Sequence, residues 1–294
     1  MLSASALSST LYFSGRPIID ITPMMGGLSH RLYLVTYHAN GTATQCVVRC
    51  INDELLATQE YALMGHASVL SASIKALERM SIDGQLVSLI IMEFIQGDLA
   101  KDVCLNDEHL TIIAEQLTSL HQSLPSSPVK RPSVNKLSLI DDYWQLVANA
   151  SAQDISRYQH CYELLRHLSF ENTSLIHGDL NLSNLIVNTH NNGVVWLDWE
   201  YASVGDAYFD YAAFIVECDQ EIEGPFIEYI QSQLDDVVDR DKLVYFKLYY
   251  ALVSWLWCMG LAESKTPQLI AALNKYRDEV DQLVAVIAAS DISL

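Results

Sequence analysis

The stretch of this chain that decides its fold reads His177-Gly178-Asp179-Leu180-Asn181-Leu182-Ser183-Asn184, and Asp198-Trp199-Glu200 follows it closely. Between them lie two apolar, β-prone runs that flank residues 188–193, whose Asn and Gly content is typical of a turn. The sequence therefore predicts a β-hairpin with Asn184 near one end and Asp198 near the other.

A turn closed by residues 188 and 194 would place Asn184 opposite Asp198. Because side chains alternate along strands, both polar groups would then share one face of the hairpin. A carboxylate and an amide oxygen held side by side suit a hard cation such as Mg²⁺. Asp179 precedes Asn184 by five residues, so it can face whatever the metal holds. This pattern predicts a phosphoryl-transfer site with a base for a hydroxyl and two ligands for the metal of a nucleoside triphosphate.

The chain resembles the choline/ethanolamine kinases and their relatives, the thiamine kinases and aminoglycoside phosphotransferases, which share a protein-kinase-like fold. The resemblance extends from about residue 20 to the last helices. It implies an α+β fold of two lobes, an antiparallel-sheet lobe over residues 1–95 and a larger, mainly helical lobe over residues 96–294. It rests on residues 177–184, Asp198-Trp199-Glu200-Tyr201-Ala202, Gly205-Asp206, Phe209-Asp210, Gly26-Gly27-Leu28-Ser29 and Met92-Glu93-Phe94-Ile95-Gln96-Gly97.

The resemblance also implies a role for each polar residue of the central stretch. Asp179 is expected to be the catalytic base. Asn184 and Asp198 are expected to hold Mg²⁺, while His177 and Asp206 are expected to brace the catalytic loop. A single Asp or Asn in a turn is usually a turn former or a helix cap, but the combined spacing favours the catalytic interpretation.

The first lobe is expected to hold ATP. Glycines between two strand candidates would let backbone amides approach phosphate oxygens. Arg49 ends an apolar strand where kinase-like folds carry a phosphate-binding Lys, and its forked donors fit phosphate. Glu60 is its expected ion-pair partner, with Glu54 as the alternative, and the role of His30 is left open. The residues expected at the nucleotide are Gly26, Gly27, Ser29, Arg49, Glu60, Glu93 and Phe94.

The acceptor site is expected in the aromatic-rich last third of the chain. Trp and Tyr faces attract ammonium groups, and the formal net charge of −19 favours a cationic small molecule. Choline kinases use such an aromatic box, although relatives space its tryptophans three residues apart and this chain spaces them two apart. An aromatic stripe on a helix is also typical of a core. The residues expected at the acceptor are Glu200, Tyr201, Trp255 and Trp257.

Composition narrows the class of protein further. The six cysteines form no C-x-x-C pair, which is typical of reduced thiols in the cytoplasm. Residues 1–5 do not resemble a signal peptide, and the apolar stretch 248–262 is shorter than the roughly 20 residues of a bilayer span, so a buried helix is expected. The acidic charge disfavours nucleic-acid binding. The sequence predicts a cytoplasmic, ATP- and Mg²⁺-dependent small-molecule kinase for a choline- or ethanolamine-type alcohol. The alternatives are a thiamine kinase, an aminoglycoside-type phosphotransferase, or a kinase-like nucleotide-binding module without catalysis.

Overall fold

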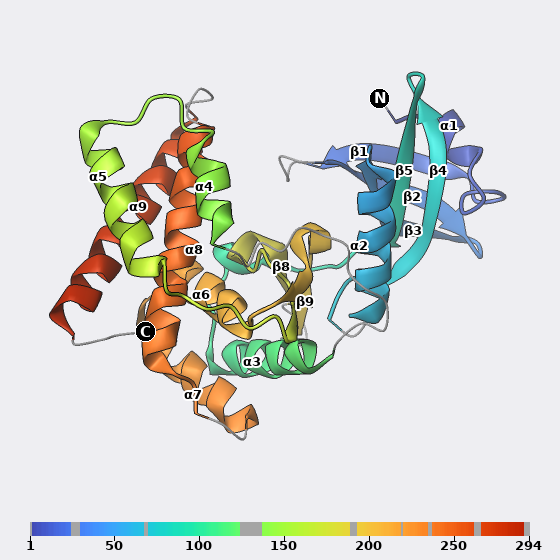
Figure 1. The fold of residues 1–294 in the computed structure, drawn as a ribbon. Coiled ribbons are helices and arrows are strands. Elements are labelled where there is room, and N and C mark those ends of the chain that lie inside the picture. The colour runs from blue at the N-terminus through green and yellow to red at the C-terminus, as the bar shows by residue number, and fades with distance from the viewer. Residues whose placement is uncertain are drawn as a thin grey trace. The chain divides into compact units, whose positions relative to one another are not determined.

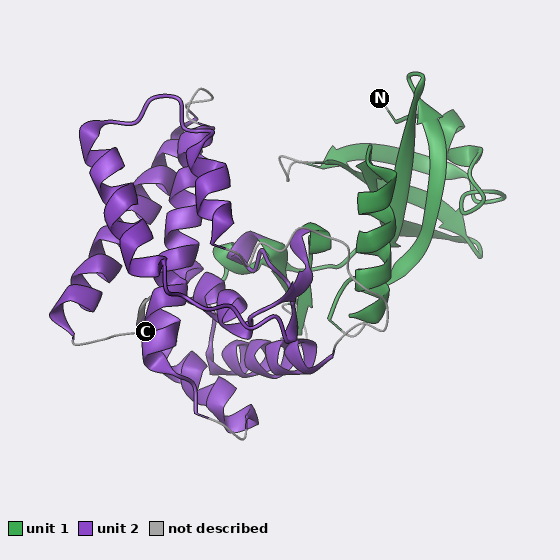
Figure 2. Ribbon diagram, viewed as in Figure 1, with its two compact units in different colours: residues 1–103, 127–130, 184–200 green, residues 104–126, 131–183, 201–294 purple. Residues whose placement is uncertain are grey.

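The structure is a computed structural model that divides into two compact units (Figure 2). Unit 1 contains Met1–Val103 and Asn184–Glu200, and unit 2 contains Cys104–Ser126, Arg131–Ser183 and Tyr201–Leu294. Residues 124–136, whose three prolines predict a linker or surface loop, lie outside the described residues, as does the motif 26–29. The structure describes residues 2–24, 30–67, 70–123, 137–188, 193–218, 220–234, 237–261 and 266–290.

Unit 1 is built on a five-stranded antiparallel sheet in the order β1-β2-β3-β5-β4 (Figure 1). Asn40 and Gly41 join β2 to β3 with φ angles of 51° and 81°, and Asp83 and Gly84 join β4 to β5 with 53° and 81°. Two successive left-handed residues match the twist of a two-residue hairpin, and Asn-Gly or Asp-Gly between apolar runs predicts such a hairpin from sequence. The structure confirms both hairpins. The strands are β1 (Ile18–Met24), β2 (Arg31–Ala39), β3 (Thr42–Ile51), β4 (Ile74–Ile82) and β5 (Gln85–Glu93).

The two faces of this sheet carry different partners. Cys46, Val48 and Cys50 of β3 belong to an apolar core that includes Leu7 of the short helix α1 (Ala4–Ser8). The alternate residue Arg49 must point to the opposite face. Helix α2 (Glu54–His66) contacts β3, β4 and β5. The alternation along β3 therefore directs one charged residue toward α2.

A smaller sheet in unit 1 holds the hairpin predicted from the central stretch. It contains β6 (Asp98–Leu99), β8 (Leu185–Val187) and β9 (Val194–Trp196). Val187 pairs with Val194, and the turn closes between Asn188 and Gly193, whose N–H···O distance is 2.8 Å.

The predicted register of this hairpin is wrong by one residue. Leu185 pairs with Trp196, and Asn184 lies opposite Leu197, whose N–H donates to the Asn184 carbonyl at 2.8 Å. A one-residue shift exchanges the faces of a strand. The observed register puts the large Trp196 ring on the same buried face as Leu185 and Val187, which removes more apolar surface from water than the predicted register would.

Unit 2 is mainly helical, and the long helix α8 (Arg240–Gly260) packs against α4, α5, α6 and α9. Apolar residues and a histidine recur at three- and four-residue spacing over residues 110–121, which predicts a helix with one buried face. The structure confirms this helix as α3, in which Leu110, Ile113, Ala114, Leu117 and His121 are buried. A two-stranded sheet pairs β7 (Ser174–Ile176) with β10 (Ser203–Gly205). The other helices are α3 (Asp107–Gln122), α4 (Ser138–Trp144), α5 (Ala152–Leu165), α6 (Ala207–Glu217), α7 (Glu223–Gln233) and α9 (Pro267–Ala289). Short 3-10 turns are η1 (Ala100–Asp102), η2 (Leu182–Asn184), η3 (Trp199–Tyr201) and η4 (Gln220–Ile222).

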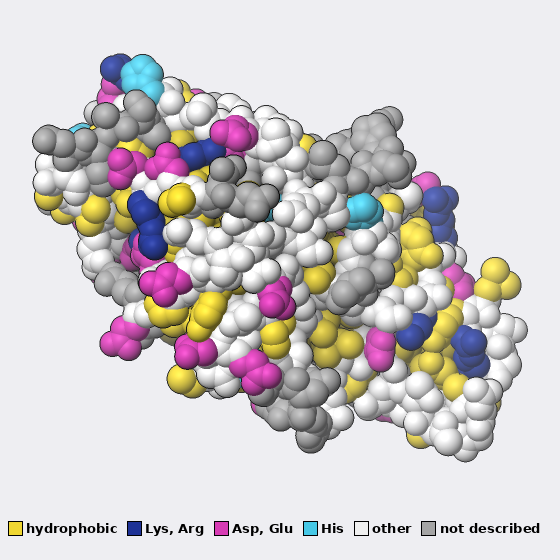
Figure 3. All heavy atoms as spheres, turned by 90° about the horizontal axis from the view of Figure 1, so that it is seen from below, with side chains coloured by type: hydrophobic (Ala, Val, Ile, Leu, Met, Phe, Trp, Pro, Cys, Tyr) yellow, Lys and Arg dark blue, Asp and Glu magenta, His cyan; other side chains and the backbone are white. Residues whose placement is uncertain are grey.

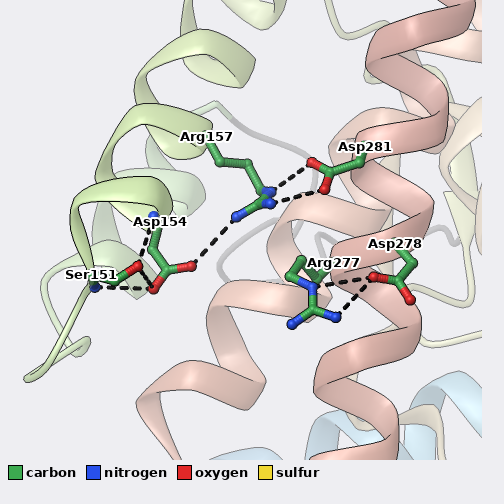
Figure 4. A network of polar contacts seen from close by, with 6 residues as sticks. All are labelled: Ser151, Asp154, Arg157, Arg277, Asp278 and Asp281. Carbon is green, nitrogen blue, oxygen red and sulfur yellow. Dashed lines mark hydrogen bonds and ion pairs between the residues drawn. The ribbon is translucent and has the colours of Figure 1, made fainter.

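Helix α8 is long and apolar enough to cross a bilayer by length and composition alone. However, 61% of its most apolar window is buried inside the protein, as in the core helix of a globular unit. Arg157 of α5 forms a bidentate ion pair with Asp281 of α9 (Figure 4). Its Nε lies 2.6 Å from Asp281 Oδ1 and its Nη2 lies 2.8 Å from Asp281 Oδ2. These contacts link the last helix to the rest of unit 2.

The surface reflects the acidic composition of the chain. On the face drawn in Figure 3, acidic side chains are spread widely, and Lys and Arg side chains are scattered rather than gathered into one patch among the residues described there. Such a surface attracts cations over distances of about a Debye length, ~8 Å at physiological salt.

Candidate functional site

Arg49 lies at the centre of a buried ion-pair cluster in unit 1. Its Nη1 is 3.2 Å from Glu60 Oε1, and its Nη2 is 2.8 Å from Asp198 Oδ1 and 3.0 Å from Glu200 Oε2. Its side chain is 7% exposed, so these contacts form largely out of water. The expected ion pair with Glu60 is therefore present, whereas Glu54 pairs elsewhere.

A helix cap helps to bring Glu60 to this cluster. The N-cap residue Asp53 accepts a hydrogen bond from Leu56 N at 3.0 Å and so starts α2, which then carries Glu60 on its buried face. Burial alone would lower the pKa of Arg49, but the nearby charges of Glu60, Asp198 and Glu200 raise it above its usual value. The guanidinium therefore stays charged within the cluster.

Glu200, which the sequence places at the acceptor, faces the Arg49 cluster. Besides Arg49, its Oε2 lies 3.0 Å from His30 Nε2, and its side chain is only 9% exposed. His30 directly follows the Gly-rich motif, so this contact connects the motif to the Asp-Trp-Glu segment. The role of His30, which the sequence leaves open, is therefore to pair with Glu200. Of the other residues expected at the nucleotide, Glu93 ends β5 with an exposed side chain and Phe94 follows it.

Asn184 and Asp198 flank the same end of the hairpin in unit 1. Asp198 adopts a left-handed backbone with φ of 61°, which is uncommon for a residue with a side chain. This conformation breaks the strand alternation on which the predicted side-by-side placement depended. The bond from Leu197 N to Asn184 O nevertheless keeps the two segments adjacent.

The donor set of Asn184 and Asp198 fits Mg²⁺. This cation is commonly held by one or two protein oxygens together with phosphates and water. The Asp198 side chain is 25% exposed, so a carboxylate oxygen can reach a solvated ion. Among the described residues, no group of three or more His, Cys, Asp or Glu side chains is placed to hold a metal. The two residues would hold the ion as part of a nucleotide complex.

In unit 2, Asp210 of α6 holds the backbone just before Asp179. Asp210 accepts hydrogen bonds from His177 N at 2.8 Å and Gly178 N at 3.0 Å, and its Oδ2 is 3.0 Å from His121 Nε2. Asp210 is fully buried. A buried carboxylate with several hydrogen-bond partners therefore sets the path of the loop that presents Asp179.

Gly178 gives this loop its sharp turn. Its φ is 79°, and a Cβ there would lie 2.4 Å from the Tyr201 carbonyl oxygen. Only glycine fits, because the left-handed backbone and the close approach both exclude a side chain. The loop then brings Asp179 next to Asn181, whose Nδ2 donates to Asp179 Oδ1 at 3.1 Å.

The two residues expected to brace the loop lie at different points. His177 is fully buried directly before Gly178. Asp206 instead accepts from Tyr208 N and Glu171 N, each at 3.0 Å, and pairs with Lys242 Nζ at 2.9 Å. Asp206 thus caps α6 and joins it to the segment before β7 and to α8. Asp210, noted in the sequence only as part of a resemblance, makes the direct bonds to the loop.

Glu217, at the end of α6, forms a carboxylate–tyrosine cluster that the sequence did not predict. Its Oε1 accepts hydrogen bonds from Tyr250 OH at 3.0 Å and Tyr276 OH at 2.5 Å, while Lys275 Nζ donates to its Oε2 at 2.9 Å. The Glu217 side chain is 12% exposed. A carboxylate beside two aromatic rings is an arrangement that attracts ammonium groups.

The charge of Asp179 reaches this cluster. Burial raises the pKa of Tyr250 and of Tyr276 well above the usual value, and the negative charges of Glu217 and Asp179 add to the rise. Burial likewise raises the pKa of Tyr143 of α4, with Asp179 the first charge to add to it. Within unit 2, therefore, the charges of Asp179 and Glu217 act on the same two tyrosines.

The predicted acceptor aromatics fall in different surroundings. Trp255 is 1% exposed, with the Arg157 guanidinium 5.5 Å from its ring. Trp257 is 36% exposed and lies seven residues, about two helical turns, beyond Tyr250, on the same face of α8. Tyr201 is 38% exposed, and its backbone lies against Gly178. A spacing of two residues separates the two tryptophans by roughly 200° around the helix.

Comparisons with known proteins identify the family and the fold of this chain. A family model described as the phosphotransferase enzyme family matches residues 20–243. The protein LicA homolog of Metamycoplasma hominis is 28% identical over 193 residues, 65% of this chain and 75% of that protein.

The crystal structure of choline kinase LicA from Streptococcus pneumoniae has a TM-score of 0.67 at 19% identity, covering 91% of this chain and 94% of that one. LicA in complex with AMP matches with the same TM-score of 0.67. A thermostable mutant of aminoglycoside phosphotransferase APH(4)-Ia has a TM-score of 0.71 at 14% identity, covering 98% and 100%.

These matches bear on two predictions from the sequence. The solved structures confirm the two-lobed, kinase-like α+β fold. The family match, which covers well over half of the chain, confirms the resemblance and the prediction of a phosphotransferase. This chain belongs to the phosphotransferase enzyme family.

Proposed function

We propose that this phosphotransferase transfers the γ-phosphoryl group of ATP to the hydroxyl of a small cationic amino alcohol of the choline or ethanolamine type. The observation that carries the proposal is the Glu217 carboxylate with Tyr250 and Tyr276 at hydrogen-bonding distance. An ammonium group gains from both the carboxylate and the ring faces when water is largely excluded. The charge of Asp179 acts on the same two tyrosines, which supports placing the acceptor hydroxyl at Asp179.

In this proposal, Asp179 receives the proton of the acceptor hydroxyl as the new O–P bond forms and the bond to ADP breaks. Asn184 and Asp198 would supply oxygen ligands for Mg²⁺, which when bound would offset the charge of the phosphates. Arg49 pairs with Asp198 Oδ1 and so positions this carboxylate, and the Gly178 turn sets the direction of Asp179. Because Asp179 and Asn184 are five residues apart, the chain limits their separation to roughly 18 Å.

The relatives support the same acceptor class. LicA from Streptococcus pneumoniae is described as a choline kinase, and LicA has been solved with AMP. We place the reaction in the cytoplasm, where ATP is available and where the six free cysteines would stay reduced. The thiamine and aminoglycoside kinases of the same family are the competing acceptor classes.

A panel of acceptors tests the proposal. Choline, ethanolamine, thiamine, a fructosamine and an aminoglycoside are each incubated with γ-labelled ATP and Mg²⁺, and labelled product is measured. We expect the highest kcat/KM with choline or ethanolamine. A preference for an aminoglycoside would contradict the acceptor class, and ATP binding without product from any acceptor would favour a non-catalytic module.

Replacing Glu217 tests the proposed cation subsite, which consists of Glu217, Tyr250 and Tyr276. Glu217→Gln keeps an oxygen that can accept from the two tyrosines but removes the charge. We expect the KM for choline to rise about tenfold, since hydrogen bonds and contacts to charged groups contribute ~1.5–3 kcal/mol, while the KM for ATP stays unchanged. Glu223→Gln is the matched control, because Glu223 pairs with Lys247 at 2.7 Å rather than with the tyrosines. An equal effect of both variants would argue against a specific subsite.

Replacing Asn184 or Asp198 tests whether this end of the hairpin binds Mg²⁺. Asp198→Ala should abolish Mg²⁺-dependent turnover, and Asn184→Ala should raise the Mg²⁺ concentration needed for half-maximal rate about tenfold or more. Because Asp198 also pairs with Arg49, Mg²⁺-dependent ATP binding is measured by calorimetry alongside the rate. Asp20→Ala, on the exposed part of β1, is the control. Unchanged Mg²⁺ titrations in both hairpin variants would remove these residues from the role.

A further inference from the structure

The two oxygens of the Glu217 carboxylate have different partners. Oε1 accepts from both tyrosine hydroxyls, whereas Oε2 accepts from Lys275 Nζ at 2.9 Å. The Lys275 ammonium also lies 5.3 Å from the centroid of the Tyr276 ring. It therefore already makes the two contacts, with a carboxylate oxygen and with an aromatic ring, that a cationic acceptor would make at this place.

Moving the Lys275 ammonium away from Glu217 costs little free energy, because the ammonium is partly exposed to water. Its side chain is 42% exposed, while that of Glu217 is 12% exposed, so the ammonium comes from the solvent side of the pair. Glu279 lies four residues further along α9, the spacing at which Lys and Glu pair on one helix face. The pKa of Glu279 is raised, chiefly by burial, and the charges of Lys247 and Lys275 act against that rise. Glu279 thus offers the displaced ammonium a second carboxylate.

We propose that Lys275 is a built-in occupant of the acceptor's cation subsite and that an incoming ammonium group must displace it from Glu217 Oε2. The inference rests on the proposed function and adds a specificity-determining residue to it. A cationic acceptor exchanges one ammonium for another, so Glu217 keeps a positive partner throughout. A neutral alcohol cannot make this exchange, because removing Lys275 would leave the carboxylate without a cation in a largely dry place. Lys275 therefore selects for cationic acceptors and weakens their apparent affinity.

The test compares Lys275→Met with the wild-type enzyme, using choline and its uncharged analogue 3,3-dimethyl-1-butanol. We expect the KM for choline to fall about two- to fivefold, the range set by partly exposed ion pairs. The kcat and the KM for ATP should not change. The KM for the analogue should fall by at least as much as that for choline, because the analogue no longer has to displace a cation from Glu217, so the preference for choline becomes smaller. Arg277→Met is the matched control. Arg277 lies two residues after Lys275 in the sequence and forms a surface ion pair with Asp278 (Figure 4), so this variant removes the same charge without touching Glu217. Lys275→Arg keeps a cation and should behave like the wild type.

Binding of tetramethylammonium, measured by calorimetry without ATP, separates this inference from the proposed function. Tighter binding to Lys275→Met and to a second neutral variant, Lys275→Gln, than to the wild type would support displacement even if choline were not a substrate. A choline KM and a tetramethylammonium affinity that are unchanged or weaker in both neutral variants would overturn the inference. An equal gain in Arg277→Met would also overturn it, because the effect would then come from net charge alone.

Discussion

Asp179→Asn is expected to lower kcat by at least about 10², the effect of losing a general base. The substitution keeps the size of the side chain and an oxygen that can accept from Asn181 Nδ2, a bond of 3.1 Å in this structure. The loop before it is held through the backbone of His177 and Gly178, so its path should not change. Only the capacity to take the proton of the acceptor hydroxyl is lost.

The measurement is a steady-state titration of both substrates, together with ATP binding by calorimetry. The KM for the acceptor and the affinity for ATP should stay within about twofold, because the loss is confined to the transition state. Asp142→Asn is the matched control, since both Asp179 and Asp142 contribute to the raised pKa of Tyr143. Near-normal turnover in Asp179→Asn, or an equal loss in Asp142→Asn, would remove Asp179 from the role of base.

Asp210→Asn is expected to have the largest effect on stability. Asp210 is fully buried and accepts from two backbone N–H groups and lies 3.0 Å from His121 Nε2. An amide in its place would turn an NH₂ group toward at least one donor, which leaves buried polar groups without partners. Breaking one side of such a buried set costs ~3–5 kcal/mol, which corresponds to a lowering of Tm of roughly 6–15 °C for a chain of this size.

Thermal unfolding monitored by circular dichroism checks this value. Asp278→Asn is the control, because Asp278 is 61% exposed and pairs with Arg277 at the surface, so its loss should change stability by no more than about 1 kcal/mol. We also expect kcat of folded Asp210→Asn to fall while the KM for ATP is unaltered, since the loop that presents Asp179 would lose its support. A wild-type Tm for this variant would contradict the assigned bonds.

Local signals in the sequence were sufficient for most of the elements of unit 1. The Asn40-Gly41 and Asp83-Gly84 turns need only two left-handed residues, and Asp53 caps α2 with its own side chain. The hairpin register needed more than local information. It depends on burying Trp196 with Leu185, and the left-handed backbone of Asp198 has no signature in the neighbouring residues.

The site was harder to predict where its parts come from distant helices. Glu217 ends an ordinary apolar helix, and its partners Tyr250 and Tyr276 lie on two later helices, so no motif links them. Residue type alone favours both tryptophans as acceptor residues, but a separation of two residues sends Trp255 into the core and leaves Trp257 partly exposed. Contacts across helices, rather than spacing within one, decide which aromatic residues are available to a ligand.

The segment Asn184–Glu200 belongs to unit 1, whereas the residues on both sides of it belong to unit 2. During synthesis, the first 103 residues therefore emerge without Asp198 and Glu200. Of the three carboxylates that the structure describes around Arg49, this part of the chain carries one, Glu60. The first unit can complete its ion-pair cluster only after the ribosome has translated residues 104–183. An isolated fragment ending at Val103 would contain the whole large sheet but would lack two of the three carboxylates around a buried guanidinium.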